Sequence, residues 1–139
     1  NIPAFLPNSL ACLALNQLED IENINSHRVE ITKIYEEGLK DFDSFKYEEG
    51  NVLLRFSLKV EKRNELVKFL RGRNIYVGDW YDTPIAPKET QLESVGYSIG
   101  MCPQSEGACD QIINLPTHVN ITKKDALFVV KSIKEFYGD

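Results

Sequence analysis

The stretch Val52-Leu53-Leu54-Arg55-Phe56-Ser57-Leu58-Lys59-Val60 decides how this chain folds. Its second half alternates apolar and polar side chains, which is typical of a strand that is buried on one face. Residues 62–72 follow with apolar side chains at helical spacing, and residues 75–77 form a second short apolar run. We therefore predict a strand, a helix that ends in the left-handed conformation at Gly72 or Asn74, and a second short strand.

A long helix precedes this strand. Apolar residues recur every three or four positions between Leu10 and Tyr35, and no Gly or Pro interrupts the pattern before Gly38. This spacing predicts one long helix over about residues 8–40 that presents an apolar face. The weak helix formers at 23–26 permit a kink in it.

The C-terminal part reads as a loop followed by three short elements. Residues 82–103 contain three prolines and two glycines, which predicts a long loop of the kind that is usually functional or mobile. A helix is expected over 104–113 and an extended segment over 114–118, because the residue before a proline avoids the helical region. Thr122 is expected to cap the last helix, with Asp125 completing an acidic variant of the capping box.

The order of elements indicates the fold class. A long helix, a strand, a helix, a strand, a loop, a helix, a short strand and a helix fit a small sheet covered by helices, which is an α+β domain. With 139 residues, the chain has the size of a single domain. We therefore predict one domain over residues 1–139, with the long helix at about 8–40 and an α+β core at about 51–137.

Composition excludes several classes of function. Sixteen basic and 21 acidic residues give a formal charge of −5, whereas binding to nucleic acid needs a basic surface. No apolar run approaches the length of a membrane-spanning helix, so we expect no membrane association. An odd number of cysteines, three, favours reduced thiols in the cytoplasm over a disulfide framework. The start at Asn1 suggests an excised or processed piece.

The residues alone give no self-contained catalytic set. Cys102, Cys109 and His118 lack the spacing of a zinc site. Cys102 lies in the loop and is the best candidate for a reactive thiol, because Cys12 and Cys109 fall on apolar faces where cysteine is usually part of the core.

Two short segments are candidates for ligand contact. Trp80-Tyr81 follows a strand and precedes the long loop, so this aromatic pair either covers the core or forms a ligand surface. His118 ends an extended segment, where it either closes a turn or contacts a ligand.

Three stretches in a fixed order carry a resemblance to a known family. They are Ala11-Cys12-Leu13-Ala14-Leu15-Asn16-Gln17-Leu18-Glu19 with Arg28, Ile34-Tyr35 and Gly38-Leu39; Leu70-Arg71-Gly72-Arg73-Asn74-Ile75 with Gly78-Asp79-Trp80-Tyr81; and Cys102-Pro103-Gln104-Ser105-Glu106 with Ile113-Asn114-Leu115-Pro116-Thr117-His118, Thr122 and Asp125. Together they resemble the C-terminal part of the DegT/DnrJ/EryC1/StrS aminotransferases over roughly residues 8–137. Ser105 replaces an alanine that is usual in the family.

The resemblance implies an enzyme of which this chain is one part. Members of the family are pyridoxal-phosphate enzymes of fold type I that aminate nucleotide-linked keto-sugars. Their small C-terminal domain has a mostly antiparallel sheet, and their Schiff-base lysine lies in an N-terminal catalytic domain. We therefore expect pyridoxal phosphate in an intact, cytoplasmic and homodimeric enzyme of polysaccharide or glycoconjugate biosynthesis, but no cofactor and no activity on this chain alone.

The resemblance also implies roles for individual residues. No catalytic residue is expected in this chain. Trp80, Tyr81 and His118 are expected to line the substrate side of the cleft, where they stack against and hydrogen-bond to the nucleotide sugar. The long helix is expected to link the two domains.

Two other functions remain open from the sequence. One is a stand-alone interaction or ligand-binding domain that has kept the fold without the chemistry. The other is a thiol enzyme that uses Cys102, which requires this thiol to react faster than a model thiol.

Overall fold

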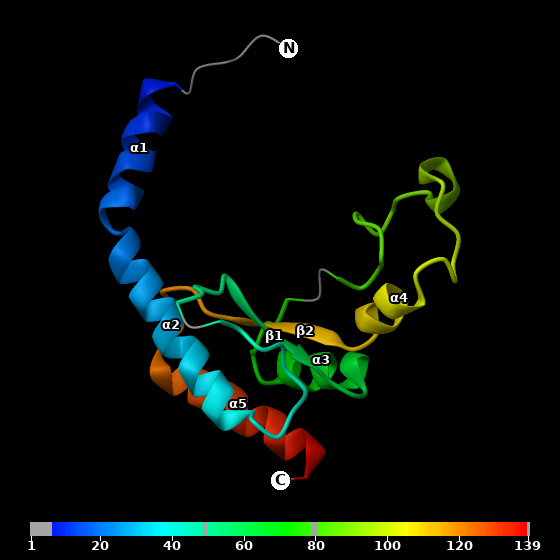
Figure 1. Ribbon diagram of the computed structural model, residues 1–139. Coiled ribbons are helices and arrows are strands. Elements are labelled where there is room, and N and C mark those ends of the chain that lie inside the picture. Colours follow the sequence, from blue (N-terminus) through cyan, green and yellow to red (C-terminus); the bar gives the residue numbers. More distant parts are fainter. Residues whose placement is uncertain (1–6, 49, 79–80, 139) are drawn as a thin grey trace.

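The computed structural model describes residues 7–48, 50–78 and 81–138. Its elements, in chain order, are α1 (Asn8–Glu19), α2 (Ile21–Gly38), β1 (Arg55–Lys59), α3 (Arg63–Gly72), a 3₁₀ helix η1 (Leu92–Val95), α4 (Pro103–Cys109), β2 (Ile112–Pro116) and α5 (Lys123–Tyr137). We call α2, β1, α3, β2 and α5 the body. We call residues 81–102 the loop arm. Both α1 and the loop arm project from the body, and an open space lies between them (Figure 1).

The sheet consists of two antiparallel strands. Arg55 pairs with Pro116 at one end and Lys59 with Ile112 at the other. A single bridge extends the sheet on each side, from Ser44 to Leu58 and from Gly78 to Asn114. The prediction of a small antiparallel sheet in an α+β domain is therefore confirmed.

The core lies between the sheet and three helices of the body. Tyr35 of α2 is fully buried, its ring lies 5.6 Å from that of Phe56, and its hydroxyl donates a hydrogen bond of 3.0 Å to the carbonyl oxygen of Pro116. This bond matters because a buried hydroxyl without a partner would destabilise the fold. The buried apolar residues are Ile31, Tyr35, Leu39, Phe56, Leu58, Val60, Leu66, Leu70, Ile75, Ile113, Leu115, Ala126, Val129, Val130 and Ile133.

The long N-terminal helix is divided in two. It breaks at Asp20, before the expected kink region at 23–26, so that α1 and α2 are separate elements. The carboxylate of Asp20 accepts a hydrogen bond of 2.7 Å from the side-chain amide of Asn23. Local bonds of this kind compete with regular helix geometry, which gives a physical reason for the break.

Two other elements differ from prediction. Residues 75–77 form no strand, and only the bridge at Gly78 joins this segment to the sheet. The helix expected over 104–113 ends at Cys109, because Ile112 and Ile113 belong to β2 and pair with β1. Branched side chains such as isoleucine pack well in a strand, which favours the strand over a longer helix at these two residues.

Three further predictions of local structure are confirmed. The helix predicted over 62–72 is α3, and Asn74 just beyond it has a left-handed φ of 60°. Thr122 and Asp125 form the predicted capping box at the start of α5. The predicted loop contains the short η1 helix within residues 82–102, and Pro103 at its end already begins α4.

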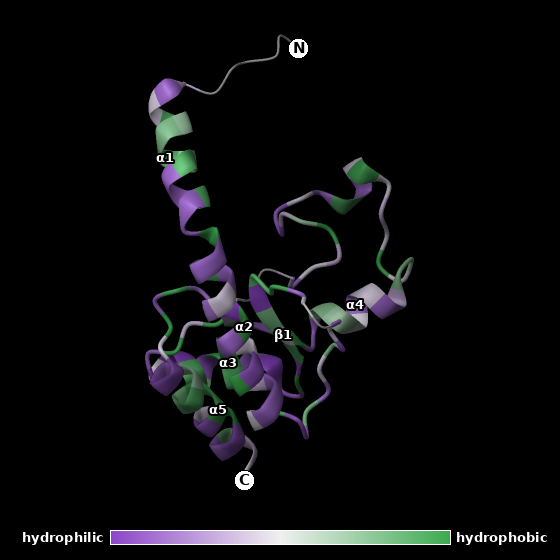
Figure 2. Cartoon of the chain, turned by 60° about the vertical axis from the view of Figure 1, so that its left-hand side comes forward, coloured by the Kyte–Doolittle hydropathy of each residue, from purple (hydrophilic) through white to green (hydrophobic). Residues whose placement is uncertain are grey.

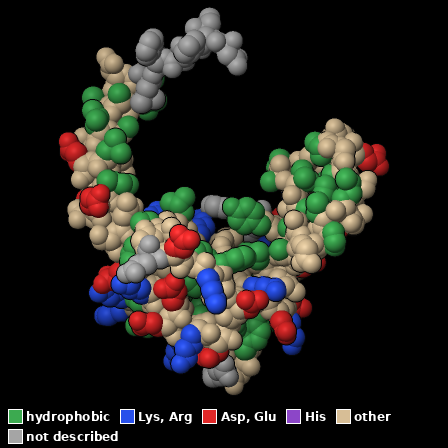
Figure 3. Space-filling view, in the orientation of Figure 1, with side chains coloured by type: hydrophobic (Ala, Val, Ile, Leu, Met, Phe, Trp, Pro, Cys, Tyr) green, Lys and Arg blue, Asp and Glu red, His purple; other side chains and the backbone are tan. Residues whose placement is uncertain are grey.

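The two projecting segments expose apolar side chains. No residue of α1 is buried, although its sequence is amphipathic (Figure 2). Leu13 is 61% exposed on α1, and Ile99 is 73% exposed on the loop arm. Figure 3 shows hydrophobic side chains along both segments. None of the described helices is both long and apolar enough to span a membrane.

Candidate functional site

His118 lies in a turn that follows β2, and hydrogen bonds of Thr117 fix this turn to the body. The side chain of Thr117 is fully buried, and its hydroxyl donates to the carbonyl oxygens of Leu53 and Leu54, at 2.8 and 2.9 Å. The same oxygen accepts a hydrogen bond of 3.0 Å from the guanidinium of Arg28. Thr117 is thus bonded to Leu53, Leu54 and Arg28, and these bonds fix the backbone from which the exposed imidazole of His118 projects.

The far end of this turn is also anchored to α2. His27 contacts the carbonyl oxygen of Ile121 through Nε2 at 3.0 Å, as a donor. The backbone N–H of Ile121 in turn donates to the carbonyl oxygen of His118 at 2.9 Å. Arg28, which the resemblance had singled out, therefore acts together with His27 to place the turn.

A pocket of about 520 Å³ opens beside His118. Its wall comes from residues 73–76, the end of β2 and the first turns of α5. Arg55, Tyr76 and Phe128 line it together with His118. The volume falls within the range of small-molecule sites. Sequence reasoning missed Arg55, Tyr76 and Phe128, because residues distant in the chain meet only in the folded protein.

Two charged residues of the pocket have their partners within the chain. Arg73 makes a bidentate contact with Glu135, both N–O distances being 2.7 Å, and this hydrogen bond lowers the pKa of the Glu135 carboxyl. Asp125 accepts from the backbone N–H and the hydroxyl of Thr122, which lowers the pKa of its carboxyl. Both carboxylates are therefore ionised at neutral pH.

The predicted aromatic pair lies elsewhere. Trp80 is outside the described residues. Tyr81 is 57% exposed at the start of the loop arm. Asp82, the residue after Tyr81, lies near Arg63, whose Nε donates to the carbonyl oxygen of Ile112 at one end of β2, whereas His118 follows the Pro116 end. The structure therefore places Tyr81 and His118 at opposite ends of one strand, and their roles in substrate binding stay predictions.

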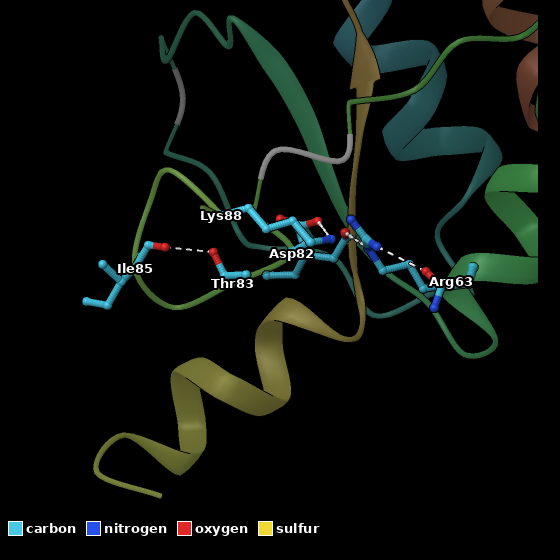
Figure 4. Close-up of polar contacts among 7 residues, drawn as sticks. Arg63, Asp82, Thr83, Ile85 and Lys88 are labelled. Carbon is cyan, nitrogen blue, oxygen red and sulfur yellow. Dashed lines mark hydrogen bonds and ion pairs between the residues drawn. The ribbon is translucent and has the colours of Figure 1, made fainter. Parts of the chain in front are cut away.

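The base of the loop arm is fixed by local polar contacts (Figure 4). Asp82 forms an ion pair of 2.6 Å with Lys88, and this contact lowers the pKa of its carboxyl. The hydroxyl of Thr83 donates to the carbonyl oxygen of Ile85 at 2.7 Å. Beside them, the Nε of Arg63 donates to the carbonyl oxygen of Ile112 at 2.8 Å, which ties α3 to β2.

The C-terminal part of the loop arm is fixed to α4 by one carboxylate. Glu106 accepts from the hydroxyl of Tyr97 at 2.5 Å and from the backbone N–H of Gly100 at 2.8 Å. These bonds, led by that from Tyr97, lower the pKa of the Glu106 carboxyl, and the same contact raises the pKa of Tyr97 to about 12. The turn that exposes Ile99 and Met101 is therefore ordered.

The described residues offer little for metal or thiol chemistry. Among residues 7–48, 50–78 and 81–138, no three His, Cys, Asp or Glu side chains come together as metal ligands. Cys102 is exposed, whereas Cys109 is buried and desolvation raises the pKa of its thiol. The expectation of a buried Cys12 is wrong, because α1 has no covering partner within the described chain.

The lysines do not fit a covalent site for pyridoxal phosphate. None of them is buried. Three form surface ion pairs: Lys59 with Asp43, Lys88 with Asp82 and Lys123 with Glu30. Lysines that act as nucleophiles are usually desolvated or placed beside another cation. No chemical step through this cofactor follows from the described residues of this chain.

Comparisons with known proteins agree with the fold. A model of the DegT/DnrJ/EryC1/StrS aminotransferase family matches residues 5–134. The pleiotropic regulatory protein of Geobacillus stearothermophilus is 28% identical over 119 residues, covering 84% of this chain and 32% of that protein. A crystal structure of a DegT DnrJ EryC1 StrS aminotransferase from Brucella abortus matches 90% of this chain and 34% of its own, with 27% identity and a TM-score of 0.76. The crystal structure of the sugar aminotransferase CalS13 from Micromonospora echinospora has 18% identity and a TM-score of 0.68. The match covers 87% of this chain and 33% of that one.

These matches settle the class of the protein: its fold is that of a domain found in aminotransferases. The chain belongs to the DegT/DnrJ/EryC1/StrS aminotransferase family. The resemblance drawn from its sequence is thereby confirmed. The chain spans about a third of the length of these relatives.

Proposed function

We propose that this chain is the small C-terminal domain of a pyridoxal-phosphate-dependent aminotransferase that acts on nucleotide-linked keto-sugars. The observation that carries the proposal is the apolar surface of α1, where no residue is buried, in a chain that spans about a third of its relatives. Helices of soluble proteins rarely leave a contiguous apolar face in water. The missing N-terminal catalytic domain is the partner that would cover this face.

In the intact enzyme, pyridoxal phosphate would supply the electrophilic carbonyl that carries an amino group from a donor such as glutamate to the keto-sugar. The described residues of this chain would bind and orient substrate. His118, on its fixed turn after β2, and Tyr81, at the start of the loop arm, would line the substrate side, and Trp80, outside the described residues, is proposed to do the same. The proposal includes a cytoplasmic homodimer and a role in polysaccharide or glycoconjugate biosynthesis.

The test compares the intact polypeptide from its native host with this chain alone. The intact protein is expected to show the absorbance change of its cofactor on addition of glutamate, and to aminate at least one member of a panel of nucleotide-linked keto-sugars. The chain alone is expected to do neither. A site-specific lysine adduct on the isolated chain, reducible by borohydride and with a shifted absorbance band, would contradict the proposal.

A further inference from the structure

A second pocket, of about 470 Å³, opens between α4 and the segment before β1. One wall is the face of α4 that carries Gly107 and Ala108, and residues 43–45 belong to the other. The volume falls within the range of small-molecule sites. Among the described residues that line this pocket, which we call the α4 pocket, neither Tyr81 nor His118 occurs. It therefore uses side chains to which the proposed function gives no role.

Both walls of the α4 pocket are fixed to β1 and to the residue that follows it. The backbone N–H of Lys59 donates to the carbonyl oxygen of Asp43 at 2.9 Å. On the side of α4, the backbone N–H of Val60 donates to the carbonyl oxygen of Gln111 at 2.8 Å. A site whose walls are ordered before binding loses little conformational entropy when a ligand enters, which favours affinity.

Gly107 leaves room in this pocket at a cost to its own helix. It lies inside α4, where glycine is a poorer helix former than alanine. A Cβ at this position would meet no packing partner within 4 Å, so packing among the described residues does not require glycine here. Phe45, which is 49% exposed, lines the pocket from the other wall. A bare backbone on one side and an aromatic ring on the other suit a flat apolar group.

The charged groups of the pocket form one exposed ion pair. The Nζ of Lys59 lies 3.2 Å from a carboxylate oxygen of Asp43, and the two side chains are 49% and 72% exposed. An exposed pair contributes little to stability, so both groups can turn to a ligand at small cost. The side-chain amides of Gln104 and Gln111 add neutral donors and acceptors. A ligand with a single charge would be attracted by one member of the pair and repelled by the other, whereas a zwitterion can pair with both.

We propose that the α4 pocket binds a free α-amino acid with an apolar side chain, with phenylalanine as the best-suited example. Its carboxylate would pair with Lys59 and its ammonium with Asp43, while its ring would lie between Phe45 and the backbone of Gly107. The proposal does not rest on the proposed function. Glutamate, the amino donor named there, would place a second carboxylate against the apolar part of this pocket.

The test is a titration of the ¹⁵N-labelled chain with L-phenylalanine, followed by amide chemical shifts. Three probes each lack one part of this ligand: 3-phenylpropionate lacks the ammonium, phenethylamine lacks the carboxylate, and glycine lacks the ring. We expect saturable shifts confined to residues around Lys59, Gly107 and Gln111, and affinity for phenylalanine at least tenfold above that for each probe and for L-glutamate. The absence of saturable shifts, shifts across the whole surface, or a smaller preference over any of these compounds would overturn the proposal.

A pair of variants on α4 locates the ligand. Gly107→Leu places a side chain in the pocket where no neighbour obstructs it, and it is expected to weaken phenylalanine binding at least tenfold. Ser105→Leu adds the same side chain at an exposed position of the same helix outside the pocket lining, and it is expected to leave affinity unchanged. Unchanged affinity in Gly107→Leu, or an equal loss in both variants, would exclude this pocket.

A second pair of variants tests the ion pair. Lys59→Met removes the partner of the ligand carboxylate and is expected to weaken phenylalanine binding at least fivefold. Lys123→Met breaks the exposed pair with Glu30 at the start of α5, outside the pocket lining, and is expected to leave affinity unchanged. Equal affinity of the unmodified chain and Lys59→Met would contradict the proposal. These titrations involve no amine transfer, so their failure would leave the aminotransferase proposal standing.

Discussion

The body and α1 carry the same kind of amphipathic pattern but differ in what covers it. In the body, the apolar residues of α2, α3 and α5 meet the sheet, and Ile31, Leu66 and Ile133 are fully buried. On α1, leucines at similar spacing stay in water, with Leu13 61% exposed. The difference teaches that periodicity predicts a helix and its apolar face, whereas the partner of that face has to be found in the structure.

The largest expected effect separates these two regions directly. Phe56→Ala removes a fully buried ring and is expected to destabilise the isolated chain by about 3–5 kcal/mol. Leu13→Ala is expected to change its stability by less than about 0.5 kcal/mol, since the side chain is already exposed. Urea denaturation followed by circular dichroism measures both. A cost for Leu13→Ala close to that for Phe56→Ala would mean that α1 packs against the body or against another copy of the chain.

A pair of glycines tests packing within the body. A Cβ at Gly38 would lie 2.7 and 2.9 Å from the two methyl groups of Val130, a stiff side chain, so Gly38→Ala is expected to cost about 1–3 kcal/mol. Gly72 has no atom within 4 Å of the same point, and Gly72→Ala is expected to stabilise the chain by roughly 0.4–1 kcal/mol. Thermal unfolding of the two variants should therefore shift in opposite directions. A shift of the same sign for both would contradict the close approach of α2 to α5.

The start of α5 offers a smaller effect. Thr122→Ala removes the hydroxyl that accepts from the backbone N–H of Asp125, and it is expected to cost about 1 kcal/mol in the free energy of unfolding. Thr122→Ser retains the hydroxyl and serves as the matched control. If the serine variant lost as much stability as the alanine variant in urea denaturation, the capping bond would not be the cause.

The smallest expected effect is local to the loop arm. Glu106→Gln is expected to speed hydrogen exchange at the Gly100 amide without changing global stability, because the carboxylate accepts bonds from Tyr97 and Gly100. The pKa of this carboxyl is lowered in the folded state, so its contribution is present above the ordinary glutamate pKa and disappears as the pH falls through the lowered value. In the unmodified chain, hydrogen exchange at the Gly100 amide, corrected for its intrinsic rate, should therefore accelerate only in acid. Equal protection in both proteins at neutral pH would contradict this contact.

Local signals predicted much of the body correctly. The alternation around Phe56, the capping pair of Thr122 and Asp125, and the left-handed Asn74 each depend on near neighbours in the chain. The errors arose where distant residues decide. Ile112 and Ile113 continue a helical pattern, yet pairing with β1 places them in a strand. The break at Asp20 depends on one side-chain bond to Asn23 that periodicity does not register.

The candidate site was less predictable than the fold. His118 was identified from its place after a proline-containing segment, and the structure puts it on the rim of a pocket. Arg55, Tyr76 and Phe128 carry no local signal, because a strand, a connecting segment and a helix have to meet before they share a wall. The resemblance groups Tyr81 with His118, and only the folded chain, where Asp82 lies near Arg63 and Arg63 is bonded to Ile112, reveals that they lie at opposite ends of β2.

The central claim is that this chain is one domain of a larger aminotransferase, and the mass of the native polypeptide tests it most directly. An antibody raised against this domain would capture the polypeptide from its host, and mass spectrometry would weigh it. We expect a single chain about three times larger than 15.9 kDa, as its relatives are. A native mass near 15.9 kDa would contradict the claim and favour a stand-alone binding domain.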